Sequence, residues 1–351
     1  MCDNSTAPNF QLPTPTQNLG IGDWELGIDG IRSKASRFGV IAFVFPGQGA
    51  QKVGMGRTLV ESFPEARAAF EEADGAFGDE PPALSTLCFD GPDDRLALTE
   101  ITQPAMLTAS IAACRVLQSR GVHPAFVAGH SLGEYPAHVA AGTFTLGDAV
   151  RIVRRRGRYM QEAVPVGEGA MAAIVGAPLD AVRQACNEAA DGQVVSPANI
   201  NGGGQIVIAG HAAAVARASE RAKALGARRA IPLSVSAPFH CALMKPAEER
   251  LEPELRGLAL QEPRIPVVAN VDGEPKRTAK EGIEALVRQV SSPVQWEAVV
   301  RRLASEGVTT YVEVGPGTVL GGLIKRIHSD ARITHFDSPG ELDAVMAACS
   351  I

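Results

Sequence analysis

Short apolar runs alternate along the chain with longer segments in which apolar positions recur every three or four residues. Continuous runs that end at glycine or proline are typical of strands buried on both faces of a parallel sheet, and the longer spacing is typical of amphipathic helices. The first run, Val40–Phe45, ends at Pro46-Gly47, and Ala125–Ala128, Ile265–Ala269 and Tyr311–Val314 are of the same kind. Helices are expected around 57–76, 104–120, 147–163, 281–290, 295–306 and 318–327.

The pattern changes between residues 168 and 234. Strand-like and helical segments follow one another there in the order Gly169–Val175, Leu179–Ala190, Gln193–Asn199, Gln205–Ile208, Ala212–Leu225 and Arg229–Val235. The order β-α-β-β-α-β is that of a ferredoxin-like unit. We therefore predict an α/β fold, with a hydrolase-like core built on a parallel sheet and an inserted ferredoxin-like (βαββαβ) small domain.

Length and composition suggest how the chain is divided. Its 351 residues exceed the roughly 250–300 at which single hydrophobic cores stop growing. Residues 1–37 are polar and weakly periodic, so we expect a loosely held N-terminal extension there. The predicted large α/β catalytic domain covers 38–166 and 235–340, and the predicted small domain covers 167–234.

Charge and cysteine content argue against several classes of function. The formal charge of −6 is unsuited to binding a nucleic-acid phosphate backbone. The six cysteines lie far apart and form no C-x-x-C pair, which argues against a disulfide framework or a zinc site and favours a reducing compartment. Neither a membrane-spanning run nor a secretory signal is visible in the sequence, so we expect a soluble, cytoplasmic protein.

The segment Gly129-His130-Ser131-Leu132-Gly133 contains the first candidate for chemistry. A serine with a glycine two residues before and two residues after it, placed between a strand and a helix, fits a nucleophile elbow, in which small neighbours permit a strained turn that exposes Oγ. The N–H groups at the start of the following helix suit a developing oxyanion. The alternative is a serine that caps an ordinary helix.

A serine nucleophile needs a base, and His240 is the best placed of the seven histidines. It comes soon after the last strand of the inserted unit, at a junction of two domains, where ligand clefts usually form. His130 is adjacent to Ser131, but neighbouring side chains on an elbow point apart. A lone histidine is more often structural than catalytic, so both interpretations of His240 stay open.

Helical periodicity separates Arg156 from the arginines around it. At about 100° per residue, Arg156 falls on the apolar side of its helix, away from a basic stripe formed by Arg151, Arg154, Arg155 and Arg158. A buried guanidinium needs an anion, either an Asp or Glu of the protein or a substrate carboxylate held by two parallel hydrogen bonds. Geometry alone favours the internal salt bridge.

Six motifs occur in register between about residues 39 and 328, and together they resemble one known family. They are Phe45-Pro46-Gly47-Gln48-Gly49-Ala50-Gln51, Thr102-Gln103-Pro104-Ala105, Gly129-His130-Ser131-Leu132-Gly133-Glu134-Tyr135, Arg156-Gly157, Phe239-His240-Cys241-Ala242-Leu243-Met244 and Glu313-Val314-Gly315-Pro316-Gly317. The family is that of the malonyl-CoA:acyl carrier protein transacylases of fatty acid synthesis and the matching acyltransferases of polyketide assembly lines. Each motif alone is weak, but six in order are specific.

The resemblance implies an enzyme that moves a malonyl group from malonyl-CoA to the phosphopantetheine thiol of an acyl carrier protein. It implies that Ser131 is the nucleophile, that His240 is the general base and that Arg156 pairs with the malonyl carboxylate, which reverses the preference from geometry. It implies no cofactor and no metal. We expect no nucleic-acid or membrane partner and a monomeric enzyme.

The same resemblance assigns further positions in the site. The backbone N–H groups of Gln48 and Leu132 are expected to form the oxyanion hole, and Gln103 is expected to line the pocket. The carbonyl of Gln289 is expected to orient the histidine in place of a triad carboxylate, with Asn270 nearby.

Phe239 bears on the choice of acyl group. In the polyketide relatives, a bulky aromatic residue before the histidine accompanies malonyl, and a smaller serine accompanies branched extenders. We therefore expect malonyl to be preferred, although one methyl group in a pocket is worth only roughly 1–3 kcal/mol.

Two other functions stay open at this point. An acyl hydrolase of the same fold would clear acyl groups from carrier proteins, but a hydrolase of monocarboxylic groups has no carboxylate for Arg156. A non-catalytic module would only dock acidic carriers through the basic stripe. Such a module would not need Ser131, His240 and Arg156 together, so we favour an enzyme.

Overall fold

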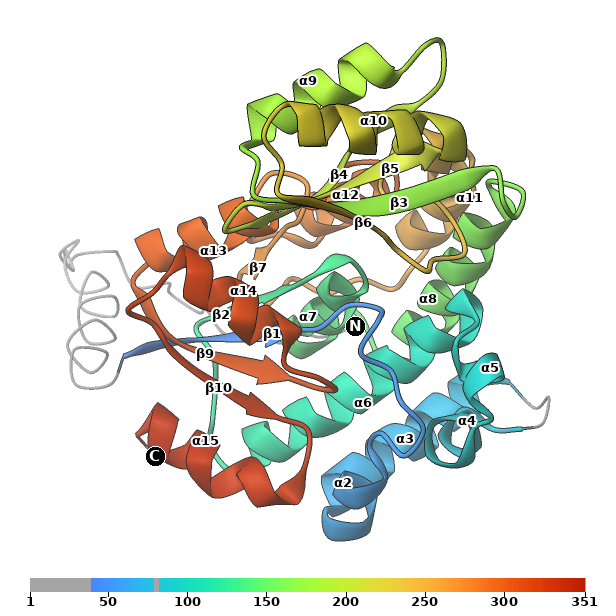
Figure 1. Ribbon diagram of the computed structural model, residues 1–351. Coiled ribbons are helices and arrows are strands. Elements are labelled where there is room, and N and C mark those ends of the chain that lie inside the picture. The colour runs from blue at the N-terminus through green and yellow to red at the C-terminus, as the bar shows by residue number, and fades with distance from the viewer. Residues whose placement is uncertain (1–38, 79–81, 351) are drawn as a thin grey trace, which may run out of the picture. The chain divides into compact units, whose positions relative to one another are not determined.

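The larger of two sheets is covered by helices on both of its faces (Figure 1). The computed structural model describes residues 39–78 and 82–350, so the predicted extension over 1–37 lies outside the described residues. Within them, the larger sheet has six strands in the order β10-β9-β1-β2-β7-β8. They are β1 (Val40–Phe45), β2 (Phe126–Gly129), β7 (Val267–Val268), β8 (Pro275–Lys276), β9 (Val308–Val314) and β10 (Arg332–Phe336). All neighbouring pairs are parallel except β7 and β8, which confirms the predicted parallel sheet.

Strand β1 shows why the sheet is covered on both faces. Successive side chains of a strand point to opposite faces. Phe43 and Phe45 accordingly enter one hydrophobic cluster, and Ala42 and Val44 enter another on the opposite face. All four are fully buried. The continuous apolar run in the sequence follows from this burial on both sides.

Helices supply most of the remaining hydrophobic surface. The cluster around Phe43 is built largely from α3 (Pro64–Phe77), α6 (Thr99–Ser119), α7 (Glu134–Ala141) and α8 (Leu146–Glu162). The opposite cluster contains residues of α13 (Trp296–Ser305) and α14 (Val319–Ile327). The other helices here are α2 (Arg57–Ser62), α4 (Leu84–Asp90), α5 (Asp93–Leu96), α11 (Lys245–Arg256), α12 (Ala279–Gln289) and α15 (Leu342–Cys349).

The helical stretch expected over 57–76 is confirmed, but it is divided into the two helices α2 and α3. Pro64 is the first residue of α3, and Phe63 before it is extended, with φ −132° and ψ 125°. A proline disfavours helical geometry in the residue before it, and this breaks the helix at Phe63.

The second sheet is antiparallel, in the order β4-β5-β3-β6 (Figure 1). Its strands are β3 (Gly169–Val175), β4 (Val195–Gly202), β5 (Gln205–His211) and β6 (Arg229–Pro232), with α9 (Leu179–Ala189) and α10 (Ala212–Ala224) on one face. The predicted β-α-β-β-α-β order is confirmed. The other face places Met171 and Ala173 against the segment that contains Cys241, next to His240.

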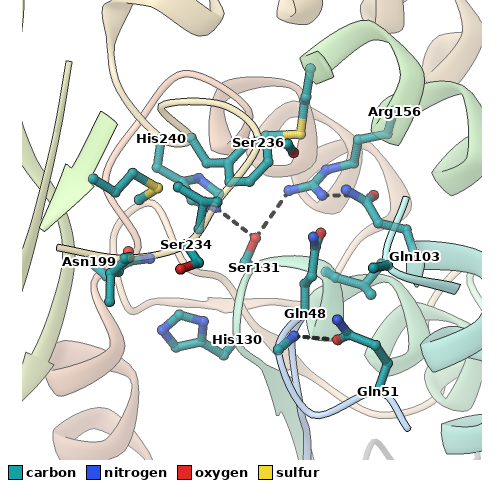
Figure 2. Close-up of a pocket in the computed structure, with 18 residues that line it drawn as sticks. Gln48, Gln51, Gln103, His130, Ser131, Arg156, Asn199, Ser234, Ser236 and His240 are labelled. Atoms are coloured by element: carbon teal, nitrogen blue, oxygen red, sulfur yellow. Dashed lines mark hydrogen bonds between the residues drawn. The ribbon is translucent and has the colours of Figure 1, made fainter. Parts of the chain in front are cut away.

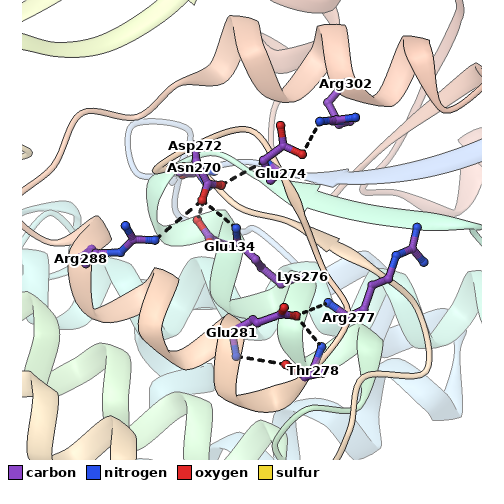
Figure 3. Close-up of polar contacts among 10 residues, drawn as sticks. All are labelled: Glu134, Asn270, Asp272, Glu274, Lys276, Arg277, Thr278, Glu281, Arg288 and Arg302. Carbon is purple, nitrogen blue, oxygen red and sulfur yellow. Dashed lines mark hydrogen bonds and ion pairs between the residues drawn. The ribbon is translucent and has the colours of Figure 1, made fainter.

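A short connection joins β4 to the loop that follows α12. The backbone of Val294 donates to Ala198 O at 2.9 Å and accepts from Ile200 N at 2.9 Å. The start of α12 is fixed by a capping box between Thr278 and Glu281 (Figure 3). The antiparallel sheet is thereby tied to the end of α12, which carries Gln289.

None of the helices in the described part of the chain combines the length and the hydrophobicity that a membrane crossing requires.

Candidate active site

A pocket of about 400 Å³ opens beyond the carboxyl ends of β1 and β2. Such an edge of a parallel sheet is where α/β proteins commonly bind ligands. Figure 2 shows Ser131 near its centre, with His240 on one side and Arg156 on the other. The lining includes the predicted residues Gln48, Gln103, Ser131, Leu132, Arg156, Phe239 and His240, and also Met160, Met171 and Asn199.

The turn that carries Ser131 is strained and depends on its glycines. Ser131 has φ 51°, which is uncommon for a residue with a side chain. A Cβ added to Gly129 would lie 1.9 Å from Gly133 O, and one added to Gly133 would lie 2.0 Å from Phe45 O. Both glycines are therefore required by close backbone approach. The turn is the elbow that the sequence predicts.

His240 lies between the serine and the end of α12. Its Nε2 is 2.6 Å from Ser131 Oγ, and its Nδ1 is 3.0 Å from the backbone oxygen of Gln289. Because a carbonyl only accepts, Nδ1 carries the proton of the neutral ring and Nε2 is left to accept from the serine hydroxyl. Burial, followed by the charge of Arg156, lowers the pKa of His240 to about 3, so the ring is neutral near pH 7.

Arg156 is 1% exposed and points from α8 toward the serine. Its Nη1 donates to Gln103 Oε1 at 2.9 Å, and its Nη2 donates to Gln289 Oε1 at 3.0 Å and to Ser131 Oγ at 3.2 Å. Its Nε has no hydrogen-bond partner within the residues described. These acceptors are all uncharged, and no described carboxylate forms a salt bridge with Arg156. The internal salt bridge that geometry alone favours is thus wrong, although the predicted burial is confirmed.

The neighbouring basic stripe has a different character. Arg151 pairs with Asp148 at 2.7 Å and Arg155 pairs with Glu254 at 2.7 Å, both on partly exposed side chains. Arg154 lies over the ring of Phe77 at 4.1 Å. These contacts are ordinary for a solvated face, and such exposed pairs contribute little.

Asn270, which is expected near the histidine and grouped with Gln289 as a residue that orients it, forms its hydrogen bonds with the serine turn instead. Its Oδ1 accepts from Ser131 N at 2.7 Å, and its Nδ2 donates to Gly129 O at 2.7 Å. Among the described hydrogen bonds it has none to His240, because both polar atoms of its amide are used by the elbow. Asn270 therefore holds the turn, and the contact that orients the ring comes from the Gln289 carbonyl.

Glu134 is a site residue that the sequence reasoning does not identify. It is fully buried behind the pocket, where it accepts from Gln289 and from the backbone of Asn270. Its position inside the Gly129–Tyr135 motif was the available signal, but an acidic residue in the first turn of a helix is usually a surface residue that favours the helix dipole.

Comparison with known proteins agrees with this geometry. The family model described as "Acyl transferase domain" matches residues 42–341. The chain belongs to the acyl transferase domain family. This confirms the resemblance that the six motifs predict.

The relatives of this acyl transferase cover nearly its whole body. It is 50% identical over 306 residues to the malonyl CoA-acyl carrier protein transacylase of Escherichia coli K12, a match that covers 87% of this chain and 98% of the relative. It is 46% identical to the protein of the same name from Bacillus subtilis, over 86% of this chain and 95% of that one.

Solved structures show the same fold. An acyl carrier protein S-malonyltransferase from Vibrio cholerae superposes with a TM-score of 0.84 at 46% identity, over 87% of this acyl transferase and 99% of that chain. A malonyl-transacylase solved in complex with a type II PKS acyl-carrier protein has a TM-score of 0.85 at 45% identity, over 89% and 100% of the two chains.

Proposed function

We propose that this acyl transferase moves a malonyl group from malonyl-CoA to the phosphopantetheine thiol of an acyl carrier protein, in fatty acid or polyketide biosynthesis, through an acyl-Ser131 intermediate. The observation that supports this most is the state of Arg156. Its guanidinium is buried 3.2 Å from the serine oxygen and forms no salt bridge with any residue that the structure describes. Buried cations are normally paired. A malonyl thioester carries a free carboxylate one methylene from the carbonyl that Ser131 would attack.

In the first half-reaction, Ser131 Oγ attacks the thioester carbonyl while His240 Nε2 takes the hydroxyl proton. The carbonyl oxygen becomes an oxyanion, and the backbone N–H groups of Gln48 and Leu132, two residues that line the pocket, are proposed to bind it. Collapse of this intermediate breaks the carbon–sulfur bond, and His240 returns the proton to the sulfur of coenzyme A. The malonyl group is left as an ester on Ser131.

The second half-reaction uses the same groups in the same order. The carrier thiol gives its proton to His240 and attacks the ester carbonyl, and collapse returns the proton to Ser131 Oγ. Gln289 is the last residue of α12, so its carbonyl lies at the negative end of the helix dipole and stabilises the imidazolium formed in both steps.

Phe239 lines the pocket beside His240 and is proposed to occupy the space that a 2-methyl group needs. Malonyl is therefore the proposed acyl group.

The proposed working form is a cytoplasmic monomer. The cysteines of the described residues, Cys88, Cys114, Cys186, Cys241 and Cys349, are free and buried, as suits a reducing compartment.

Incubation with labelled malonyl-CoA, followed by mass mapping of the modified peptide, tests the function. We expect a malonyl adduct on Ser131 that disappears in Ser131→Ala and moves to carrier protein bearing phosphopantetheine, but not to carrier lacking it. A hydrolase of the same fold is the weaker candidate, because it gives no role to Arg156. Rapid release of acetyl from carrier protein, without malonyl loading, would favour it.

A further inference from the structure

Glu134 is a buried carboxylate to which the proposed reaction assigns no step. It is the first residue of α7, three positions after Ser131, and is 0% exposed. Its Oε2 accepts from Gln289 Nε2 at 2.7 Å and from the backbone N–H of Asn270 at 3.0 Å (Figure 3 shows Glu134 with Asn270). Its Oε1 has no hydrogen-bond partner in the part of the chain that the structure describes. Burying a carboxylate costs several kcal/mol, so its presence requires a compensating interaction.

Hydrogen-bond chemistry gives Glu134 control over the side-chain amide of Gln289. The Nε2 of that amide donates to Glu134 Oε2 and, at 2.9 Å, to the backbone oxygen of Ser131. An ionised carboxylate and a carbonyl only accept, so the two amide hydrogens face them and Oε1 faces the opposite way. There, Oε1 accepts from Arg156 Nη2 at 3.0 Å. A reversed amide would set its NH₂ group against the N–H donors of the guanidinium.

Where it is ionised, Glu134 also supplies negative charge behind Arg156, and this charge is fully present only above the pKa of the carboxyl group. Burial raises the pKa of Glu134 to about 7, with a smaller opposing effect from its hydrogen bonds and from Arg156. Asp272, on the loop between β7 and β8, raises the pKa slightly further. The carboxylate and the guanidinium thus form a pair separated by one amide, in a region closed to solvent.

We infer that Glu134 is a positioning residue for the substrate carboxylate, which acts through Gln289 to hold Arg156 toward the pocket while leaving it free of a direct salt bridge. A carboxylate in direct contact with the guanidinium would have to be displaced by each incoming malonyl group. Because the side-chain amide of Gln289 separates the Glu134 carboxylate from Arg156, the negative charge offsets the buried cation and leaves the guanidinium free to bind the substrate carboxylate. The inference rests on the proposed malonyl transfer and adds a residue that determines acyl-group preference.

Glu134→Gln is the first test, because it keeps the shape of the side chain and removes its charge. We expect the rate of Ser131 acylation by malonyl-CoA to fall roughly 10- to 100-fold, mainly through a higher KM, because a charged acceptor is lost in a dry site. Acylation by acetyl-CoA, which has no second carboxylate, should fall much less. Asp272→Asn is the matched control: it removes an exposed carboxylate near Glu134, and both rates should stay at the wild-type level.

A double-mutant cycle separates positioning from a merely structural role. In an Arg156→Ala background, Glu134→Gln should cause no further loss of malonyl loading, because Arg156, the residue that it positions through Gln289, is absent. If Glu134→Gln does not fold, as judged by thermal unfolding, Gln289→Leu replaces it in the cycle, since that variant breaks the same connection and keeps the carbonyl that contacts His240.

The outcomes distinguish the inference from the function on which it rests. A wild-type protein that loads no malonyl overturns the proposed function. Two results would overturn the inference alone, given a wild-type protein that loads malonyl. One is a Glu134→Gln variant with an unchanged ratio of malonyl to acetyl loading. The other is a loss from Glu134→Gln that adds to the loss from Arg156→Ala.

Discussion

Arg156 is the residue on which the proposed choice of acyl group depends. We expect Arg156→Ala to lower malonyl loading of Ser131 roughly 100-fold or more, because the substrate carboxylate loses charge-assisted hydrogen bonds in a site closed to water. Acetyl loading should fall far less, since acetyl has no carboxylate to pair. The measurement is the acylation rate of Ser131 from malonyl-CoA and from acetyl-CoA.

Arg151→Ala is the control for removing an arginine from the same helix. Arg151 is exposed and pairs with Asp148, so its loss should leave both acylation rates near the wild-type values. Equal losses of malonyl and acetyl loading in Arg156→Ala would contradict the pairing with the substrate carboxylate.

Phe239 gives a second prediction about the acyl group. In a competition between malonyl-CoA and methylmalonyl-CoA, the wild-type protein should load mainly malonyl, and Phe239→Ser should shift the ratio toward methylmalonyl by roughly 10-fold, the effect of one methyl group in a pocket. A wild-type preference for methylmalonyl would rule out the proposed role of this ring.

His138 gives a prediction about stability and pH. It is buried in α7 and stacks on Phe144, and burial lowers its pKa from 6.5 to about 3. Below pH 6.5 the unfolded state binds a proton that the folded state excludes, so acid favours unfolding. Between pH 7 and pH 5, the wild type should lose about 2 kcal/mol more unfolding free energy than His138→Gln.

Urea denaturation of both proteins at the two pH values measures this difference. Titrations of groups shared by wild type and variant cancel in the comparison, including those of His130 and His240. Parallel pH dependence in the two proteins would mean that His138 takes up its proton in the folded state.

Sequence reasoning reaches some site residues more easily than others. Ser131 and Arg156 are found because their signals are local: flanking glycines in one case and helical periodicity in the other. Glu134 is missed because its burial depends on Asn270, 136 residues away along the chain. The absence of a salt bridge at Arg156 depends in the same way on neutral side chains brought in from other elements.

At the scale of elements, the turn between β2 and α7 is the most constrained part of the site. We expect Gly133→Ala to lower the unfolding free energy by about 3 kcal/mol and to abolish acylation of Ser131, because its Cβ would lie 2.0 Å from a backbone oxygen that cannot easily move. Thermal or urea unfolding and malonyl loading are the measurements.

Gly75→Ala is the matched control for that substitution. Gly75 is exposed inside α3, and an added Cβ would meet no atom of the described residues within 4 Å. Replacing it should therefore raise stability by roughly 0.5–1 kcal/mol, since alanine has less backbone freedom to lose on folding. If Gly133→Ala and Gly75→Ala changed stability and malonyl loading to the same extent, steric crowding at the elbow would not be the cause of the loss.

Elements with a clear periodicity are predicted well from sequence. Strands β1 and β3 are found with their observed bounds because each is a continuous apolar run. Helix α11 is not predicted, since Pro253 inside it argues against a helix, yet Ala247, Leu251 and Leu255 line one buried face. Strand β10 is missed because its mixture of polar and apolar residues resembles a loop. Its hydrogen bonds to β9 stabilise it as a strand.

At the scale of the whole molecule, we expect the two sheets to unfold together. The described residues form one compact unit, and β4 is hydrogen-bonded to the loop after α12. Cys114 and Cys186 report on the two parts, since they lie in separate hydrophobic clusters and each is 1% exposed. Burial also raises the pKa of both thiols to about 12, so neither should react in the native state.

Alkylation across a urea gradient, with mass mapping of each cysteine, measures this. Both thiols should become reactive at one common midpoint. A lower midpoint for Cys186 would instead support the predicted division into a large domain and a small domain over 167–234, with independent stability in the smaller one.

Gln289 contacts His240 through its backbone carbonyl and the guanidinium of Arg156 through its side-chain amide. Every amino acid has a backbone carbonyl, so replacement at this position can change which acyl group is accepted while leaving proton transfer intact. The preference for an acyl group can therefore change during evolution without a change in the groups that transfer protons. Under the proposed roles, we expect a relative that handles uncharged acyl groups to carry other side chains at positions 156 and 289 and to keep the serine and the histidine.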